Sequence, residues 1–426
     1  MEIVYDKSVI VIPKHLSFDF FEEVLENSLH HTNGQIQKII VNMGSKAGDN
    51  YCSFIYRVEI KYKERSDTSQ DCSFDLPVII KSTPASPSTD FLDDMEVFLK
   101  EKIFYYHVLP LMENLMDKKT RFGAKIFHSV RRPVNTFVFE DLNALGYKLA
   151  SREKGLDETH ALMVLRRLAQ FHSNSVAVMK KDPTLLTCFK NGILATAAIR
   201  KEKSKFYGFI KSSCEGLIDL AKTWNGYKEI VQKMEKYSAN LQEHLLKMQQ
   251  PFPGEFEVLN HGDLWVNNVM FKYDVKCAPS DMVFLDYQMS IWGSPGIDLN
   301  YFFYTSLSPD LLKSKREFFI RFYYNELKTN LSKLQFAADV IPSYEELRKQ
   351  ITRREPFGFF ANHAIYPIIS IDEKLAGDST FENFANPEFA RRKFKQIFSQ
   401  QKLQKMYAYT LLHFNEMKVF DKGGIL

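Results

Sequence analysis

The chain has 426 residues, of which 45% are hydrophobic and 25% charged, with a formal net charge of +4. This composition is ordinary for a globular protein and excludes disordered, collagen-like and disulfide-scaffold classes. The small net charge gives no reason to expect nucleic-acid binding, which needs a concentrated basic stripe. The cysteines form no C-x-x-C pair, and no run approaches the ~18 apolar residues of a membrane span. Since the first residues do not resemble a signal peptide, we expect a cytoplasmic protein.

The first 140 residues are predicted to form mainly strands. A helix is expected over 17–31, because Phe21, Leu25 and Leu29 recur every four positions. Large apolar residues occupy every second position of 54–62, which is typical of a half-buried strand. Further strands are expected over 36–43, 74–81, 124–130 and 134–140, and a second helix over 91–108, stopped by Pro110.

After residue 141 helical patterns dominate, beginning with a helix that Asp157 caps and continuing over 190–250 and 300–420. An irregular stretch, 257–299, interrupts them with short predicted strands at 269–272 and 281–286. We therefore predict an α+β protein with two lobes. Residues 1–140 would form a β-rich N-terminal lobe and residues 141–426 a larger helical lobe.

The strongest chemical signal lies in the irregular stretch. Asp263 ends the tripeptide His-Gly-Asp, Asn268 follows five residues later, and Asp286 closes an apolar strand. Phosphoryl transfer needs a carboxylate near the attacking hydroxyl, together with oxygen ligands for the metal ion on the triphosphate. The pattern therefore predicts Asp263 as the catalytic base and Asn268 and Asp286 as Mg²⁺ ligands. Asp and Asn also favour turns, but the order of strand, loop, strand and Asp makes that explanation the weaker one.

Three segments, HGDLWVNN, LDYQ and GSPGIDL, resemble the ecdysteroid kinase-like family. This family is grouped with choline kinases and aminoglycoside phosphotransferases in the protein-kinase-like fold. The resemblance covers nearly the whole chain and includes segments 50–58, 98–110, 139–147 and 168–173. It implies the two-lobed α+β protein-kinase-like fold, with ATP bound between the lobes.

The resemblance also assigns roles to Lys81 and Glu101. Lys81 follows the run Val-Ile-Ile at the end of a predicted strand, where a kinase lysine would contact the α- and β-phosphates. Glu101 would pair with Lys81 and fix its position, although Glu96 is a rival partner. The alternative is that Lys81 is a solvated surface lysine.

The turn 44–50 would lie over the phosphates, where Gly44 and Gly48 allow close approach of the backbone. Asn50 and Ser53 belong to the same nucleotide-binding segment. A hairpin turn uses similar residues, so this assignment depends on the catalytic set. The segment 138–142, which contains Glu140 and Leu142, would present backbone groups to adenine.

Other polar and aromatic residues near these motifs are expected to support the site. His261 should brace the catalytic loop rather than act as an acid or base, since Asp263 already fills that role. His172 should pack and brace. Asp298 should cap a helix and support the catalytic loop. Trp265 and Trp292 either line an acceptor pocket or pack in the core.

These observations predict an ATP- and Mg²⁺-dependent kinase that phosphorylates a hydroxyl group of a small molecule. The resemblance implies an apolar acceptor, such as an ecdysteroid, another steroid or a xenobiotic alcohol awaiting detoxification. No protein substrate is expected, because too little chain separates Asp286 from Asp298 for an activation segment. The basic runs 118–132 and 391–395 are interpreted as solvated faces, so neither nucleic acid nor a membrane is an expected partner.

Two alternatives remain open from the sequence. One is a choline or ethanolamine kinase. The other is a catalytically silent pseudokinase that binds a steroid. A pseudokinase would be expected to have lost at least one member of the catalytic set, all of which are present: Lys81, Asp263, Asn268 and Asp286.

Overall fold

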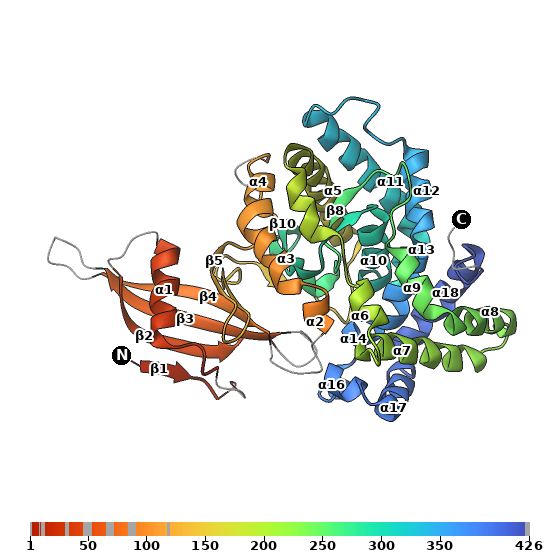
Figure 1. Ribbon diagram of the computed structural model, residues 1–426, viewed down its shortest axis with the longest axis horizontal. Coiled ribbons are helices and arrows are strands. Elements are labelled where there is room, and N and C mark those ends of the chain that lie inside the picture. Colours follow the sequence, from red (N-terminus) through yellow and green to blue (C-terminus); the bar gives the residue numbers. More distant parts are fainter. Residues whose placement is uncertain are drawn as a thin grey trace. The chain divides into compact units, whose positions relative to one another are not determined.

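The computed structural model describes residues 2–7, 9, 13–29, 34–45, 53–64, 72–83, 91–116 and 120–421 (Figure 1). Contacts divide the chain into two compact units. The first comprises Met1–Thr89 and Gly123–Lys148, and the second comprises Asp90–Phe122 and Leu149–Leu426. Strands dominate the first unit and helices the second, which confirms the predicted α+β class and is consistent with a protein-kinase-like fold.

A six-stranded sheet forms the first unit, in the order β1-β2-β3-β4-β6-β5. Its strands are β1 (Glu2–Tyr5), β2 (Gly34–Met43), β3 (Phe54–Glu64), β4 (Cys72–Ser82), β5 (Ile126–Val130) and β6 (Thr136–Glu140). β1 pairs parallel with β2, and the other neighbours pair antiparallel. The five strands predicted in this part of the chain are confirmed, whereas the short edge strand β1 was not predicted.

Helix α1 (Phe18–Leu29) covers one face of this sheet (Figure 1). Its buried residues Phe21 and Val24 belong to one core with Ile39, Val58 and Ile80 of the strands. The alternation in β3 explains this core, because every second side chain points to the helix side and is excluded from water. The predicted helix over 17–31 is therefore confirmed over Phe18–Leu29, and residues 30 and 31 lie outside the described residues.

The second unit begins with α2 (Phe91–Asp94), α3 (Val97–Ile103), the π-helical turn η2 (Phe104–Val108) and α4 (Leu109–Glu113). Helical structure was predicted here, but its end at Pro110 was wrong. Pro110 lies in the first turn of α4, where a missing N–H costs nothing. The π-helical turn before it starts a new helical register, so the chain continues past the proline.

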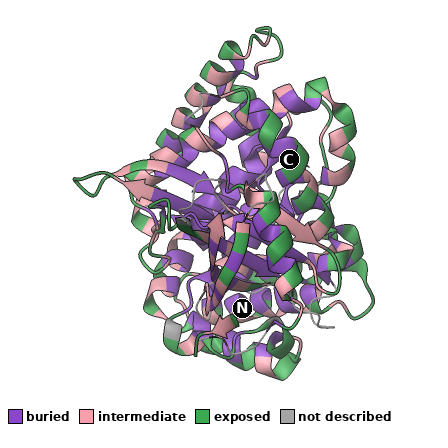
Figure 2. Ribbon diagram, turned by 90° about the vertical axis from the view of Figure 1, so that its left-hand side faces the viewer, coloured by how far each residue is buried: buried purple, intermediate pink, exposed green. Residues whose placement is uncertain are grey.

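Most of the remaining chain is helical, as predicted. Before the irregular stretch lie β7 (Lys148–Leu149), α5 (Glu158–Lys181), η3 (Pro183–Phe189), α6 (Thr196–Arg200), α7 (Lys205–Lys222), α8 (Lys228–Ala239) and α9 (Leu241–Met248). After it lie α10 (Gly296–Ser306), α11 (Pro309–Lys333), α12 (Tyr344–Arg353), α13 (Glu355–Phe360), η6 (Ala361–Ile365), α14 (Tyr366–Ile369), α15 (Glu373–Ala376), α16 (Phe381–Phe384), α17 (Pro387–Phe398) and α18 (Gln401–Glu416). Every residue of α10 is buried, so this helix belongs to the core of the unit. Figure 2 shows buried residues in purple and exposed residues in green.

The irregular stretch contains β8 (Val258–Asn260), η4 (Val266–Asn268), β9 (Val269–Tyr273), β10 (Pro279–Phe284), η5 (Tyr287–Met289) and β11 (Ile291–Gly293). β9 and β10 form an antiparallel hairpin, and β8 pairs antiparallel with β11. The two predicted strands are confirmed, except that β10 ends at Phe284 and leaves Asp286 outside it.

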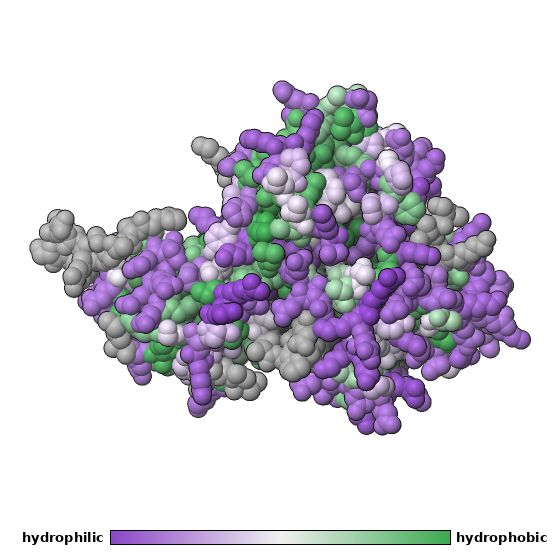
Figure 3. Space-filling view, viewed as in Figure 1, coloured by the Kyte–Doolittle hydropathy of each residue, from purple (hydrophilic) through white to green (hydrophobic). Residues whose placement is uncertain are grey.

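The second unit also carries exposed apolar side chains, among them Leu99, Tyr106, Leu111 and Leu115 of α3, η2 and the segment around α4. Figure 3 shows apolar side chains gathered on this part of the surface, within a mostly polar exterior. Among the residues that the structure describes, no helix is both long and apolar enough to cross a membrane.

Candidate active site

The loop after β8 passes so close to η5 that only glycine fits at its centre. Gly262 has φ of +82°, and a Cβ atom there would lie 2.0 Å from the backbone oxygen of Met289. Positive φ and this close approach together exclude a side chain. The sequence His-Gly-Asp thus produces a sharp turn that places Asp263 directly after a buried strand.

Asp298 anchors this turn from the first turn of α10. Its Oδ2 accepts a hydrogen bond from the N–H of His261 at 2.6 Å, and its Oδ1 accepts one from the N–H of Gly262 at 2.8 Å. His172 Nε2 lies 3.1 Å from Asp298 Oδ2, and His172 Nδ1 lies 2.6 Å from the hydroxyl of Tyr323. Asp298 and His172 are both fully buried. The predicted supporting roles of Asp298 and His172 are confirmed. The prediction that Asp298 caps the helix is wrong, because α10 begins at Gly296 and its N-cap is Pro295.

His261 braces the loop through both of its ring nitrogens. Nε2 lies 2.8 Å from the carbonyl oxygen of Leu285, and Nδ1 lies 3.4 Å from the N–H of Asp263. A ring that donates from Nε2 and accepts at Nδ1 carries one proton and is neutral. Burial favours this form, because it lowers the pKa of His261 below its ordinary value. The prediction that His261 braces the loop is confirmed.

Two side chains hold the carboxylate of Asp263. The hydroxyl of Tyr301 on α10 lies 2.5 Å from Oδ1, and the Nδ2 of Asn268 lies 3.1 Å from Oδ2. Asn268 Nδ2 also donates to the backbone oxygen of Asp263 at 2.8 Å. The sequence analysis missed Tyr301. The only signal was its position three residues after Asp298, and most tyrosines in such a place are core residues.

The hairpin brings Asn268 next to the segment that carries Asp286. The N–H of Leu285 donates to the backbone oxygen of Asn268 at 2.9 Å, so Asp286 follows immediately beyond this bond. Asp286 has φ of 64° and ψ of 70°, a left-handed conformation that is rare outside glycine. The Nε2 of Gln288 lies 3.1 Å from Asp286 Oδ2. This backbone bond therefore brings the segment that carries Asp286 next to Asn268.

These two residues fit a magnesium ion. The amide nitrogen of Asn268 donates to Asp263, so the amide oxygen is the atom of this side chain that would bind a metal ion. One amide oxygen and one carboxylate suit Mg²⁺, which takes one or two carboxylates and completes its shell with phosphate oxygens and water. In the described parts of the chain, no group of three or more His, Cys, Asp or Glu residues is placed to hold a metal ion.

Aromatic residues support Asp286 from the side of α3 and η2. The ring of Phe104 stacks on Tyr287 with centroids 3.7 Å apart, and the Tyr287 hydroxyl donates to the backbone oxygen of Phe122 at 2.8 Å. A hydrogen bond links the side-chain hydroxyl of Tyr105 to the backbone of Asp286. Burial raises the pKa of Tyr105 well above its ordinary value, and the charges of Glu101 and Asp286 add to this effect. Glu101 is itself only 2% exposed.

Lys81 lies in β4 of the first unit. It pairs with Ile55 of β3 and Phe137 of β6, so it sits inside the sheet rather than at its edge. It is 7% exposed, which contradicts the alternative of a solvated surface lysine. Its predicted ion pair with Glu101 joins the two units and stays a prediction.

Of the residues predicted to bind the nucleotide, Gly48 and Asn50 lie outside the described residues. Gly44 immediately follows β2, and its N–H donates to the oxygen of Ile55 at 2.7 Å. Ser53 immediately precedes β3. Glu140 and Leu142 lie at and just beyond the end of β6. The Oε1 of Glu140 accepts a hydrogen bond from the N–H of Lys125 at 2.5 Å. The Glu140 side chain is therefore engaged with Lys125, just before β5, and the N–H of Glu140 also donates to the oxygen of Lys125 at 3.0 Å.

The two tryptophans near the catalytic residues differ in environment. Trp265 is 6% exposed and lies in the loop between Asp263 and η4. Trp292 lies in β11 and its Nε1 donates to Oε2 of Glu257 at 3.2 Å. Burial of Trp265 and the hydrogen bond of Trp292 support the packing interpretation for both.

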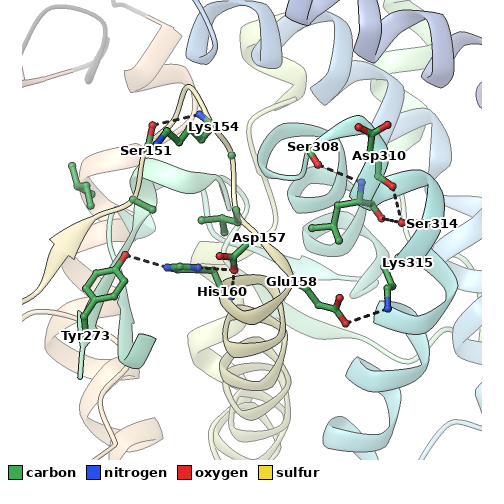
Figure 4. A pocket seen from close by; sticks show the side chains of 15 residues that line it. Ser151, Lys154, Asp157, Glu158, His160, Tyr273, Ser308, Asp310, Ser314 and Lys315 are labelled. Carbon is green, nitrogen blue, oxygen red and sulfur yellow. Dashed lines mark hydrogen bonds and ion pairs between the residues drawn. The ribbon is translucent and has the colours of Figure 1, made fainter. Parts of the chain in front are cut away.

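A cavity of about 780 Å³ lies where α5 and α11 begin (Figure 4). Its polar lining residues are largely bonded to one another. His160 lies 2.7 Å from Asp157 and 3.1 Å from the hydroxyl of Tyr273, and Lys315 lies 3.4 Å from Glu158. The cavity is at the end of β9 opposite to Asn268, and its lining does not include Asp263 or Asp286. It is therefore separate from the candidate active site.

Comparison with known proteins agrees with this geometry. A family model described as the ecdysteroid kinase-like family matches residues 47–336, which is more than half of the chain. A comparison with curated proteins finds no match. The matched range includes the catalytic loop and its anchors, and membership in this family suggests a small-molecule phosphotransferase of the kinase-like type. The chain belongs to the ecdysteroid kinase-like family.

Proposed function

We propose that the protein transfers the γ-phosphoryl group of ATP to a hydroxyl group of a small apolar molecule. The observation that carries this proposal is the joint arrangement of Asp263, Asn268 and Asp286. A base candidate and two metal-ligand candidates are fixed within one loop and one hairpin. We expect the acceptor to be an ecdysteroid or a similar hydroxylated steroid or xenobiotic, as the family description suggests.

In the proposed reaction, Asp263 aligns the acceptor hydroxyl with the γ-phosphorus. The acceptor oxygen forms a bond to that phosphorus, the bond from phosphorus to the β,γ-bridging oxygen breaks, and ADP leaves. The hydroxyl proton passes to the carboxylate of Asp263. Asn268 and Asp286 would hold Mg²⁺, whose charge offsets the negative charge on the phosphates. Positioning and electrostatics supply most of the acceleration in such a reaction.

The nucleotide would be held mainly by the first unit. We propose that Lys81 contacts the α- and β-phosphates and that Glu101 fixes its ammonium group. Two facts support these roles: Lys81 lies within the sheet, and the side chains of Lys81 and Glu101 are both buried. Charged side chains are seldom buried without a partner. The backbone near Gly44 and Ser53 would cover the phosphates, and the backbone of Glu140 and Leu142 would contact adenine.

The test is ADP release from Mg-ATP in the presence of a panel of acceptors. The panel contains ecdysteroids, other sterols, plant phenolic and glycosidic alcohols, choline and ethanolamine. We expect acceptor-dependent turnover with an apolar alcohol, and its loss by about 100-fold or more in Asp263→Asn. Asp339→Asn is the matched control, because Asp339 is exposed in a turn.

Three other outcomes contradict parts of the proposal. Turnover with choline or ethanolamine alone would replace the apolar acceptor by a cationic one. Equal turnover in Asp263→Asn and the wild type would remove Asp263 from the reaction. If Mg-ATP does not bind at all, a non-catalytic binding protein becomes the better explanation.

A further inference from the structure

Tyr301 makes a hydrogen bond to the proposed catalytic base. Its hydroxyl donates to Oδ1 of Asp263 at 2.5 Å. Tyr301 is fully buried, and its ring lies beside Phe357 with centroids 6.1 Å apart. A ring packed in this way has little freedom to move, so the position of its hydroxyl is fixed by the core.

Helix α10 controls both parts of the catalytic segment. Asp298 and Tyr301 are three residues apart and therefore lie on the same face of the helix. Asp298 binds the backbone N–H groups of His261 and Gly262, while Tyr301 binds the side chain of Asp263. One rigid helix thus sets the path of the loop and the direction of the carboxylate at its end.

We propose that Tyr301 is a positioning residue, which holds the Asp263 carboxylate in the orientation that receives the acceptor hydroxyl. This inference rests on the proposed function, in which Asp263 binds that hydroxyl. The transition state of phosphoryl transfer is loose, so the base needs to be aimed accurately more than it needs to be strong. A misplacement of about 1 Å can cost roughly 100-fold in rate. Tyr301 prevents such a misplacement by fixing Oδ1, while Asn268 fixes Oδ2.

The chain offers a matched control on the same helix. Tyr304 is also fully buried in α10, and its hydroxyl lies 2.6 Å from Oε2 of Glu355. Tyr301→Phe and Tyr304→Phe each remove one hydroxyl group that donates a hydrogen bond to a carboxylate. Both variants should lose comparable stability, but only Tyr301→Phe loosens Asp263.

The kinetic test measures phosphorylated acceptor and ADP separately. We expect Tyr301→Phe to lower kcat for phosphorylation about 10- to 100-fold, with little change in the KM for ATP. The yield of phosphorylated acceptor per ADP should also fall, since a badly aimed base favours transfer to water. Tyr304→Phe should keep the wild-type yield. A wild-type yield and kcat in Tyr301→Phe, or an equal loss of both in Tyr304→Phe, would overturn the proposal.

A second test needs no acceptor and uses thermal unfolding of four chains: wild type, Tyr301→Phe, Asp263→Ala and the double variant. In the wild-type background Tyr301→Phe should lower Tm, because it removes the bond to Asp263. In the Asp263→Ala background it should lower Tm by less, because the bond to Asp263 is already absent. Additive losses of Tm would contradict the proposed contact. If the wild type phosphorylates no acceptor, the proposed function fails, but this cycle still decides whether Tyr301 holds Asp263.

Discussion

Two residues of the candidate active site, one in the loop after β8 and one just beyond β10, have backbone conformations that few amino acids adopt. Gly262 needs positive φ, and Asp286 has positive φ although it carries a side chain. A non-glycine residue in this region costs on the order of 1–3 kcal/mol, which the surrounding structure must offset. At Asp286 the bonds to Gln288 and Tyr105 contribute to that offset. The strained position coincides with a proposed metal ligand, which fits the concentration of such strain at functional sites.

Gly262→Ala should therefore destabilise the protein by at least about 3 kcal/mol and abolish phosphorylation, because positive φ and a backbone clash add together. Gly254→Ala is the control. Gly254 has φ of +79° with nothing within 4 Å of a Cβ atom, so Gly254→Ala should cost only about 1 kcal/mol of stability. Urea unfolding measures the free energy of unfolding of both variants. Equal costs for the two variants would show that the loop can move away from Met289.

Among the elements, α10 combines complete burial with an unusual number of polar side chains. Each of them has a defined partner. Asn300 Nδ2 donates to the backbone oxygen of Ile351 at 2.8 Å, and Tyr304 contacts Glu355, which forms a buried ion pair with Arg316. Buried polar groups are tolerated only when they are bonded in this way. α10 is thus tied to α11, α12 and α13 on one side and to the catalytic loop on the other.

Asp298→Asn should lower both stability and activity. The new amide nitrogen would face one of the two backbone N–H groups, which then has no acceptor. A buried donor without an acceptor lowers the free energy of unfolding by about 1–3 kcal/mol. Asp157→Asn is the control at the start of α5. Asp157 is mostly exposed and caps His160 N–H at 2.9 Å, and Asn caps a helix as well as Asp does. Thermal unfolding should show a lower Tm for Asp298→Asn only, and similar Tm values in both variants would contradict the anchoring role.

Local patterns predicted the elements well and their tertiary partners poorly. The alternation over 54–62 predicted β3 because a half-buried strand exposes every second side chain. The end of a helix at Pro110 was predicted wrongly, because the π-helical turn that resets the register leaves no pattern in the sequence. Asp263, Asn268 and Asp286 were visible as a motif. The bond from Tyr301 was not, since it depends on how α10 packs against a loop 38 residues earlier.

For the whole molecule, the pH dependence of stability should reflect His363 in the π-helical turn η6. This residue is fully buried, and neither of its ring nitrogens has a partner among the described residues. Burial lowers the pKa of His363 from 6.5 to about 3. Between these values the unfolded chain binds a proton that the folded chain does not. The folded state therefore loses stability as pH falls below about 6.5, by up to about 1.4 kcal/mol per pH unit.

His363→Leu should reduce this dependence and raise Tm at pH 5 relative to the wild type, with a smaller difference at pH 8. The leucine fills a similar volume and leaves no unbonded nitrogen. His160→Leu serves as the control, because His160 is bonded to Asp157 and Tyr273 at the cavity of Figure 4. Parallel Tm–pH curves for wild type and His363→Leu would exclude His363 as the cause.

The interleaving of the two units has a consequence for synthesis of the chain. The second unit contains Asp90–Phe122, but its other part begins only at Leu149. Phe104 stacks on Tyr287, which the ribosome adds 183 residues later. At about 5–20 residues per second, the buried face of α3 and η2 waits roughly 10 to 40 seconds for that partner. This early segment is therefore where a nascent chain needs chaperone protection, and where slow elongation would most increase aggregation.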